Sequence, residues 1–199
     1  FRVSGQLGPI DLPTHYLGQF IETSLSLSAR AGTAPLGTNH GYQHIFEEAT
    51  GRVQNEEGLQ FSWLAFNRFY TMFRSTESGD SFTHGRLGAN DPDFNLRRDP
   101  IFIHRRTPTT DQSTFVSIID SHGEYSPVTE LSTGQRSRIR DLKVTLDTPA
   151  YTVANIDLQS GDRFVVAWAH LDFAEDTIHE IQLPQGVLRW TGPQAVEAM

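Results

Sequence analysis

The sequence predicts an all-β protein, an antiparallel β-sandwich of many short strands linked by hairpins. Apolar and polar residues alternate over many short segments, which is the period of a half-buried strand. Turns that contain Gly, Pro and Asp separate these segments at short intervals. A helical domain is not expected, because no amphipathic stretch reaches the ~12 residues that a stable helix normally needs.

In the first half of the chain, alternation marks the strands one after another. Leu59, Phe61 and Trp63 alternate with more polar positions. Residues 45–50 fit either a short helix or a strand. Ser78-Gly79-Asp80 is predicted to be a hairpin turn. The expected strands of this half cover residues 15–28, 59–65, 68–74, 81–87, 101–105 and 115–119.

The second half repeats the hairpin pattern. Ser160-Gly161-Asp162 joins two alternating segments, and Pro184-Gln185-Gly186 joins two more. The expected strands here cover residues 139–146, 151–158, 163–169, 177–183 and 187–191. A chain of 199 residues is long enough for one such domain with a real core, and no boundary is visible. We therefore expect a single β-sandwich domain over residues 1–199.

The composition excludes several classes of protein. Charged residues make up 20% of the chain and hydrophobic residues 37%, which is ordinary for a globular domain. No apolar run is long enough to span a bilayer. The formal net charge of −8 argues against a nucleic-acid binder, and the absence of cysteine excludes disulfides while leaving the compartment open. Arginines cluster at 97–98, 105–106 and 136–140, either as a local positive field or as solvated strand edges.

A polar, turn-rich run from residue 84 to 98 lies between two expected strands. It contains Gly88, Asn90, Pro92 and Asn95, which are residue types that let a backbone turn and hydrogen-bond to it. A loop of this length, held by its own polar side chains, is either a binding loop or a compact structural one.

This loop is one of several motifs that, in the same order, resemble one known domain. The loop motif is Asn90-Asp91-Pro92-Asp93-Phe94-Asn95-Leu96-Arg97. The others are His15 to Gln19, Gly41 to His44, Trp63-Leu64 with Asn67 to Thr71, His122 to Tyr125, and Trp190 to Pro193. The ordered set resembles the C-terminal β-domain of the family 17 polysaccharide lyases, the oligoalginate lyases of the heparinase II/III-like group. The resemblance covers nearly the whole chain.

The resemblance implies a part in alginate degradation. Lyases of this family act exolytically, cleave uronate polysaccharide by β-elimination and release an unsaturated uronate. Their catalytic groups come mainly from an N-terminal helical toroid. A tyrosine and a structural zinc site come from the part of the β-region that precedes the matched segment. We therefore expect the catalytic residues to lie outside this chain, and the chain to bind no cofactor and to be inactive alone.

The same resemblance gives the expected partners and setting. The partners would be an alginate oligosaccharide and the N-terminal toroid of the same enzyme, in the periplasm or outside the cell. The sequence begins at Phe1 without a basic-then-apolar leader. We read it as a mature protein, a processed product or an excised piece of a larger lyase.

Elimination also indicates which side chains could contact the sugar. The uronate carboxylate must be neutralised, a Tyr or His must remove the C5 proton, and an acid must protonate the O4 leaving group. The family's β-domain is expected to contribute a glutamate to substrate recognition, for which Glu130 is the best match and Glu124 the second. Tyr125 could stack on a pyranose face. The long loop adds three candidates, Asn90, Asn95 and Arg97.

Each candidate has a structural alternative. Glu124 or Glu130 could simply pair with Arg136 or Arg138 at the surface. In the long loop, the polar side chains could serve only to hold the loop together. On the scale of the whole chain, the alternatives to a lyase domain are a non-catalytic carbohydrate-binding module and a structural assembly domain.

Metal binding and an aromatic platform are not expected. The chain has eight histidines, but Gly41 interrupts any helix that would align His40 with His44, and the other histidines lack a ligand-spacing pattern. Trp63, Trp168 and Trp190 fall in strand patterns, so we expect them in the core rather than in a row for carbohydrate binding.

Overall fold

The computed structural model describes residues 19–23, 28–29, 45–53, 59–87, 99–107, 113–184 and 186–199. No helix lies among these residues, so the prediction of an all-β chain is confirmed. It follows that the described part of the chain has no helix able to cross a membrane. The strands are β1 (Gln19–Thr23), β2 (Ser28–Ala29), β3 (Ile45–Arg52), β4 (Leu59–Ala65), β5 (Arg68–Arg74), β6 (Ser81–Leu87), β7 (Asp99–Arg105), β8 (Ser117–His122), β9 (Glu124–Ser126), β10 (Leu131–Thr133), β11 (Ile139–Asp147), β12 (Tyr151–Leu158), β13 (Arg163–Ala169), β14 (Ile178–Leu183), β15 (Gly186–Thr191) and β16 (Gln194–Ala198).

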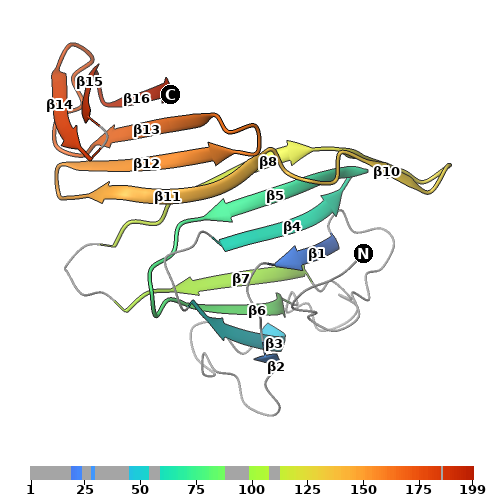
Figure 1. Cartoon of the computed structure of the whole chain (residues 1–199). Helices are drawn as coiled ribbons and strands as arrows, with labels where there is room; N and C mark the ends of the chain where they lie inside the picture. The colour runs from blue at the N-terminus through green and yellow to red at the C-terminus, as the bar shows by residue number, and fades with distance from the viewer. Residues whose placement is uncertain are drawn as a thin grey trace.

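The described strands pair antiparallel and form several small sheets (Figure 1). Sheet A has the order β1-β4-β5-β8, and sheet B has the order β2-β3-β6-β7. Sheet C has the order β11-β12-β13-β16, and sheet D is the hairpin of β14 and β15. The strands β9 and β10 form a separate hairpin that extends from the end of sheet A.

Sheets A and B pack face to face around an aromatic core. The ring of Phe61 on β4 lies 5.6 Å from that of Phe82 on β6 and 4.3 Å from that of Phe102 on β7, measured between ring centroids. Val53 and Leu59 complete the buried part of this cluster. Aromatic side chains bury a large apolar area and favour tilted contacts, so these rings hold the two sheets together.

Sheet A is a middle layer, because β5 contributes side chains to both of its faces. Met72 packs into the core with sheet B. Phe73, the next residue, packs instead with Leu142 and Ala154 of sheet C. Successive side chains of a strand point to opposite faces, so one strand serves two cores.

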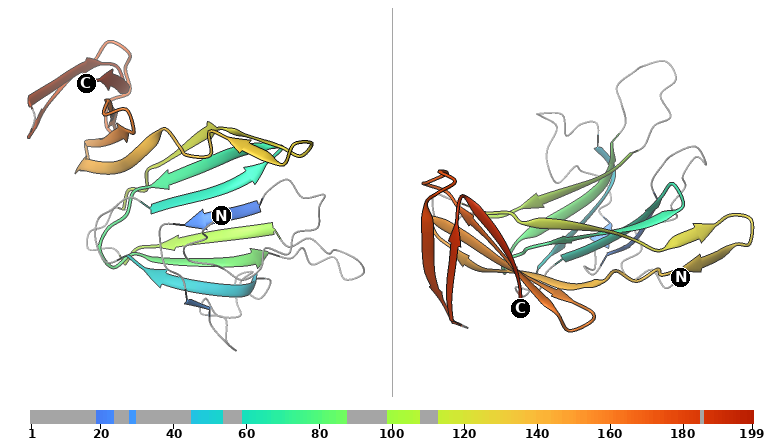
Figure 2. Two further views of the ribbon diagram at one scale, coloured as in Figure 1. Left: turned by 45° about the vertical axis from the view of Figure 1, so that its right-hand side comes forward. Right: turned by 90° about the horizontal axis from the view of Figure 1, so that it is seen from above.

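A third core joins sheets C and D. Its buried members alternate along the strands of both sheets: Val153, Val165, Ala167, Ala169, Ile181, Leu183, Leu188 and Trp190. The sheets therefore stack in the order B, A, C and D, which the two views of Figure 2 let the reader follow. The antiparallel sandwich predicted from the sequence thus has more than two layers.

The predicted strands are found in large part, with a few differences. Residues 45–50, which fitted a helix or a strand, belong to strand β3. The segment 151–158 and the segment 163–169 are strands over the ranges predicted. Two elements were not predicted, namely the β9–β10 hairpin and the closing strand β16, which pairs with β13.

One predicted hairpin is wrong. Ser78-Gly79-Asp80 lies between β5 and β6, but β5 pairs with β4 and β8 while β6 pairs with β3 and β7. The turn therefore carries the chain from sheet A across to sheet B. The physical reason is the burial of Asp80 against partners from a third segment, described below.

Candidate functional site

The β9–β10 hairpin projects beyond the ends of β4 and β5 and carries three of the predicted sugar-contacting residues (Figures 1 and 2). Ser126 pairs with Leu131, and the turn between the two strands covers residues 127–130. The sequence indicated only a loop after β8. The hairpin was missed because three-residue strands are too short for an alternating pattern to be visible.

Two glycines close the base of this hairpin. Gly123 and Gly134 have φ angles of +57° and +59°. A Cβ atom on Gly123 would lie 2.2 Å from the carbonyl oxygen of Gly134, a distance that no side chain tolerates. Gly123 is therefore required both by its left-handed backbone and by the close approach of the two chains.

His122, at the end of β8, anchors the hairpin to sheet A. Its Nδ1 lies 3.0 Å from the carbonyl oxygen of Gly134, and its Nε2 lies 2.8 Å from Oγ1 of Thr71. A carbonyl only accepts, so Nδ1 donates to Gly134, while the contact of Nε2 with the Thr71 hydroxyl ties the ring to β5. On the other side, the backbone N–H of Tyr125 donates to the carbonyl of Asn67 at 2.8 Å. His122 is thus a structural residue here.

The two glutamates of the hairpin are exposed and free of ion pairs with described residues. Glu124 lies on β9, and Glu130 ends the turn with a φ of +56°. The surface alternative, a pair with Arg136 or Arg138, is not formed among the described residues: Arg136 has no ion pair there, and the Arg138 guanidinium lies 2.8 Å from Oδ1 of the buried Asp120. Tyr125 is half-buried on the same hairpin. The three remaining candidates, Asn90, Asn95 and Arg97, lie outside the described residues.

A second polar cluster, which the sequence did not single out, surrounds Asp80. This carboxylate is 1% exposed. His104 of β7 lies with Nε2 2.7 Å from Oδ2 of Asp80, and Arg106 donates to both carboxylate oxygens at 2.8 and 2.9 Å. The backbone N–H of Glu77 adds a fourth bond at 2.9 Å. The cluster fastens the crossover between sheets A and B to strand β7.

The second arginine of the 105–106 pair is therefore not a solvated strand edge. The Arg106 side chain is 6% exposed and also pairs with Glu77 at 2.7 Å. Its guanidinium lies 4.8 Å from the ring centroid of Phe115. A planar, multiply donating guanidinium suits such a buried site. The only sequence signal for it was an acidic turn residue and a distant basic pair, which local patterns do not connect.

Burial and hydrogen bonding set the protonation of this cluster. Burial alone would raise the pKa of Asp80, but the hydrogen bonds from Arg106, the Glu77 N–H and His104 together lower that pKa. Burial lowers the pKa of His104 more than the carboxylate raises it. The geometry agrees, because Arg74 Nε donates to His104 Nδ1 at 2.8 Å and so requires an unprotonated Nδ1. His104 is a neutral donor to Asp80 at neutral pH.

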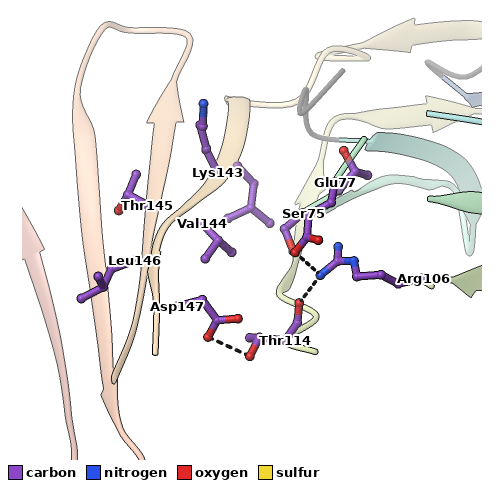
Figure 3. Close-up of a pocket in the computed structure, with 11 residues that line it drawn as sticks. Ser75, Glu77, Arg106, Thr114, Lys143, Val144, Thr145, Leu146 and Asp147 are labelled. Atoms are coloured by element: carbon purple, nitrogen blue, oxygen red, sulfur yellow. Dashed lines mark hydrogen bonds and ion pairs between the residues drawn. The ribbon is translucent and has the colours of Figure 1, made fainter. Parts of the chain in front are cut away.

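A polar cavity of about 240 Å³ lies beside this cluster, between the crossover and β11 (Figure 3). Arg106, Glu77 and Lys143 line it, together with Thr114, whose hydroxyl donates to Asp147 at 2.9 Å. Charges of both signs therefore face each other across the cavity. The described lining residues include no His or Tyr, the two residue types expected to remove the C5 proton.

The histidines and tryptophans in the described part of the chain are buried or half-buried. No group of three or more His, Asp or Glu side chains there has the arrangement of a metal site. His40 and His44 lie outside the described residues. Trp190 is 7% exposed, whereas Trp63 and Trp168 are half-buried. The tryptophans lie in three different sheets, so they do not make a platform.

Comparison with known proteins gives this chain its relatives. A scan against models of known protein families finds no match. An alginate lyase of Stenotrophomonas maltophilia (strain K279a) is 33% identical over 93% of this chain and 24% of the relative. An exo-oligoalginate lyase of Saccharophagus degradans is 29% identical over 94% of this chain and 25% of the relative. The chain spans about a quarter of the length of these relatives. It is a distant homologue of that quarter of the alginate lyases.

Proposed function

We propose that the chain is the C-terminal β-domain of an exolytic oligoalginate lyase, which cleaves uronate polysaccharide by β-elimination. The observation that carries the proposal is homology to an alginate lyase and an exo-oligoalginate lyase, over more than nine-tenths of the chain and about a quarter of each relative. Its partners would be an alginate oligosaccharide and the N-terminal toroid of the same enzyme. On the same reasoning, the protein acts in the periplasm or outside the cell, where the polymer is met.

Within this reading, the β9–β10 hairpin is the part that reaches the sugar. It stands out from the sheets, and its base is fixed by Gly123, Gly134 and the anchor His122. Glu130 is exposed, with no partner among the described residues, and has a left-handed backbone that costs about 1 kcal/mol or more. A free carboxylate on a rigid base suits the binding of sugar hydroxyls.

In β-elimination, such a carboxylate would orient the sugar rather than transfer a proton. In the elimination, the C5–H and C4–O4 bonds break, a C4–C5 double bond forms, and O4 leaves with a proton. Glu130 would accept hydrogen bonds from hydroxyls and thereby orient the pyranose, while the proton transfers take place on residues of the rest of the enzyme. Orientation of this kind raises the rate by holding the reacting atoms in place.

The test replaces Glu130 by Gln in the complete lyase, with formation of the unsaturated uronate followed by absorbance. A charge-assisted hydrogen bond contributes roughly 1.5–3 kcal/mol, so kcat/KM should fall about ten- to a hundredfold. The melting temperature should barely change, because Glu130 has no described partner to lose. Glu197→Gln, an exposed glutamate on β16, is the matched control.

Two results would overturn the assignment. Unchanged kcat/KM in both Glu130→Gln and Glu124→Gln would remove the hairpin from the sugar site. A drop in stability with unchanged kinetics would mean that the glutamate is structural. Separately, the 199-residue chain alone should produce no unsaturated uronate, because the catalytic groups are expected outside it. Steady product formation by the pure chain would contradict that.

A further inference from the structure

Three non-glycine residues in the described part of the chain have a left-handed backbone, and all three lie at one end of sheet A. Phe66 and Asn67, with φ of +48° and +64°, form the turn between β4 and β5. Glu130, with φ of +56°, ends the turn of the β9–β10 hairpin. The hydrogen bond from Tyr125 N–H to the Asn67 carbonyl joins the β4–β5 turn to strand β9 of that hairpin. Strained residues of this kind gather at functional sites.

Phe66 is the most unusual of the three. A two-residue turn with both residues left-handed favours Asn-Gly, and a bulky residue with positive φ is an outlier. Phe66 is also 71% exposed, so packing of its ring within the chain compensates little for the cost of the left-handed backbone. Local structure and packing both argue against Phe at this position. A contact with something outside the chain explains its presence.

The surroundings of Phe66 indicate what that contact would be. Arg68, two residues on, is exposed, and its side chain has no hydrogen bond or ion pair with the described residues. Glu124 and Glu130 on the joined hairpin are exposed carboxylates. These groups match the parts of a uronate sugar. The aromatic ring suits the apolar face of the pyranose, the guanidinium suits the uronate carboxylate, and the two carboxylates can accept hydrogen bonds from the sugar hydroxyls.

We propose that Phe66 and Arg68 form part of the uronate-binding surface, with the ring of Phe66 stacked on a pyranose face and Arg68 paired with a uronate carboxylate. The proposal rests on the proposed function and adds two residues of the β4–β5 turn to its sugar site. It also explains why the strained turn and the hairpin are joined by a backbone hydrogen bond, because that bond fixes Phe66 relative to Glu130.

A protein surface is the alternative occupant. Val128 and Leu131 on the hairpin are 91% and 66% exposed, and aliphatic side chains of this kind suit a protein contact. They do not account for the exposed guanidinium of Arg68 or for the unpaired carboxylates, which a sugar satisfies. The observations therefore favour the sugar, and the experiment below separates the two.

The experiment measures binding of an alginate tetrasaccharide to the 199-residue chain by calorimetry or NMR titration. Phe66→Asn installs the residue that such a turn prefers, so the melting temperature should stay the same or rise. Its affinity should nevertheless fall about three- to tenfold, and Phe66→Trp should retain binding. Phe173→Asn, which removes an aromatic residue of similar exposure in the β13–β14 connection, should leave the affinity unchanged.

Arg68→Gln should weaken binding and reduce its dependence on salt, since an ion pair with the uronate is lost. Arg189→Gln, an exposed arginine on β15, is the matched control. A loss of stability in Phe66→Asn would mean that the ring packs within the chain and would overturn the proposal. Unchanged affinity in both Phe66→Asn and Arg68→Gln, or no binding by the parent chain, would also overturn it.

The outcome is separable from that of the proposed function. If the complete lyase eliminates alginate and responds to Glu130→Gln while the Phe66 variants bind normally, only the β4–β5 turn is removed from the site. If the complete protein eliminates no uronate, the proposed function fails, but the binding titration still decides the role of Phe66.

Discussion

The tripeptide Ser-Gly-Asp occurs twice in this chain, once in a hairpin and once in a connection between two sheets. At residues 160–162 it joins β12 to β13, which pair with each other along their length. At residues 78–80 it joins β5 to β6, which lie in different sheets. The glycines have nearly the same backbone, with φ of +98° at Gly161 and +89° at Gly79. The glycine conformation is thus similar, but the turns differ: Asp80 N–H donates to the Glu77 carbonyl, whereas Gly161 N–H donates to the Leu158 carbonyl.

The difference lies in the aspartate. Asp162 is exposed, and its carboxylate accepts only a bond from the Ser160 hydroxyl at 2.8 Å. Asp80 is buried against His104 and Arg106, which come from the end of β7 and the residue after it. A buried carboxylate must be paired, so the chain can enter sheet B here only because these partners lie there. We therefore expect the long-range pairing of Asp80 to stabilise the crossover, a contribution that Asp162 does not make to its hairpin.

The largest effect that this comparison predicts is for the buried aspartate. Asp80→Asn leaves the guanidinium of Arg106 buried without its full counter-charge, and should lower the free energy of unfolding by about 3–5 kcal/mol. Urea denaturation followed by tryptophan fluorescence measures the change. A loss below about 1 kcal/mol would mean that the cluster does not fix the crossover.

Acid should act on the Asp80 cluster in the same direction. Because the pKa of folded His104 is below 6.5, the unfolded chain binds the proton first, and stability falls as the pH drops from 6.5 toward the folded pKa. The pKa of Asp80 is also lowered, so its contribution is present above 3.8 and lost as the pH falls through the folded value. Both groups therefore make the protein less stable in acid.

The measurement is the urea midpoint at several pH values between 8 and 5. His104→Gln should flatten this profile, since the group that resists protonation is gone. His170→Gln, a half-buried histidine bonded to Thr152 in sheet C, should keep the steeper profile. A profile that is unchanged in His104→Gln would place the acid sensitivity elsewhere.

The copies of Ser-Gly-Asp also show how far the sequence could predict the fold. Alternation identified β4 and β13, where buried and less buried positions alternate over part of the strand. Strand β12 was also identified, although Val153 and Ala154 are buried in cores on its two faces. Pairing depends on contacts between segments far apart, so the partners of β5 and β6 were not visible. The strands β9 and β10 have three residues each, which is too short for a pattern.

The candidate site shows the same limit. Glu124, Tyr125 and Glu130 were selected through the resemblance, and the structure adds that they lie on one projecting hairpin. Phe66 was not selected, because its significance depends on two dihedral angles and on its exposure. One signal is visible in the sequence alone: Phe66-Asn67, a two-residue turn between two clearly alternating strands, departs from the Asn-Gly that such a turn prefers.

Substitution of the two turn glycines should have equal, moderate effects. Neither Gly79 nor Gly161 has any atom within 4 Å of the position that a Cβ would take. Ala at either position therefore meets only the cost of a left-handed backbone, about 1–2 kcal/mol. Urea denaturation of Gly79→Ala and Gly161→Ala should give values that agree with each other. A much larger loss at Gly79 would show that the crossover itself needs glycine.

The smallest effect should be that of the exposed aspartate. Asp162→Asn keeps the size of the side chain, and the backbone carbonyl of residue 162 still accepts from the Leu158 N–H at 2.8 Å. Only the bond from Ser160 changes, so the free energy of unfolding should move by less than about 0.5 kcal/mol. This change in the free energy of unfolding measures what the aspartate contributes to a turn when it has no buried partners. A loss above about 1 kcal/mol would mean that part of the Asp80→Asn effect is also local, and the buried partners would then explain only the remainder.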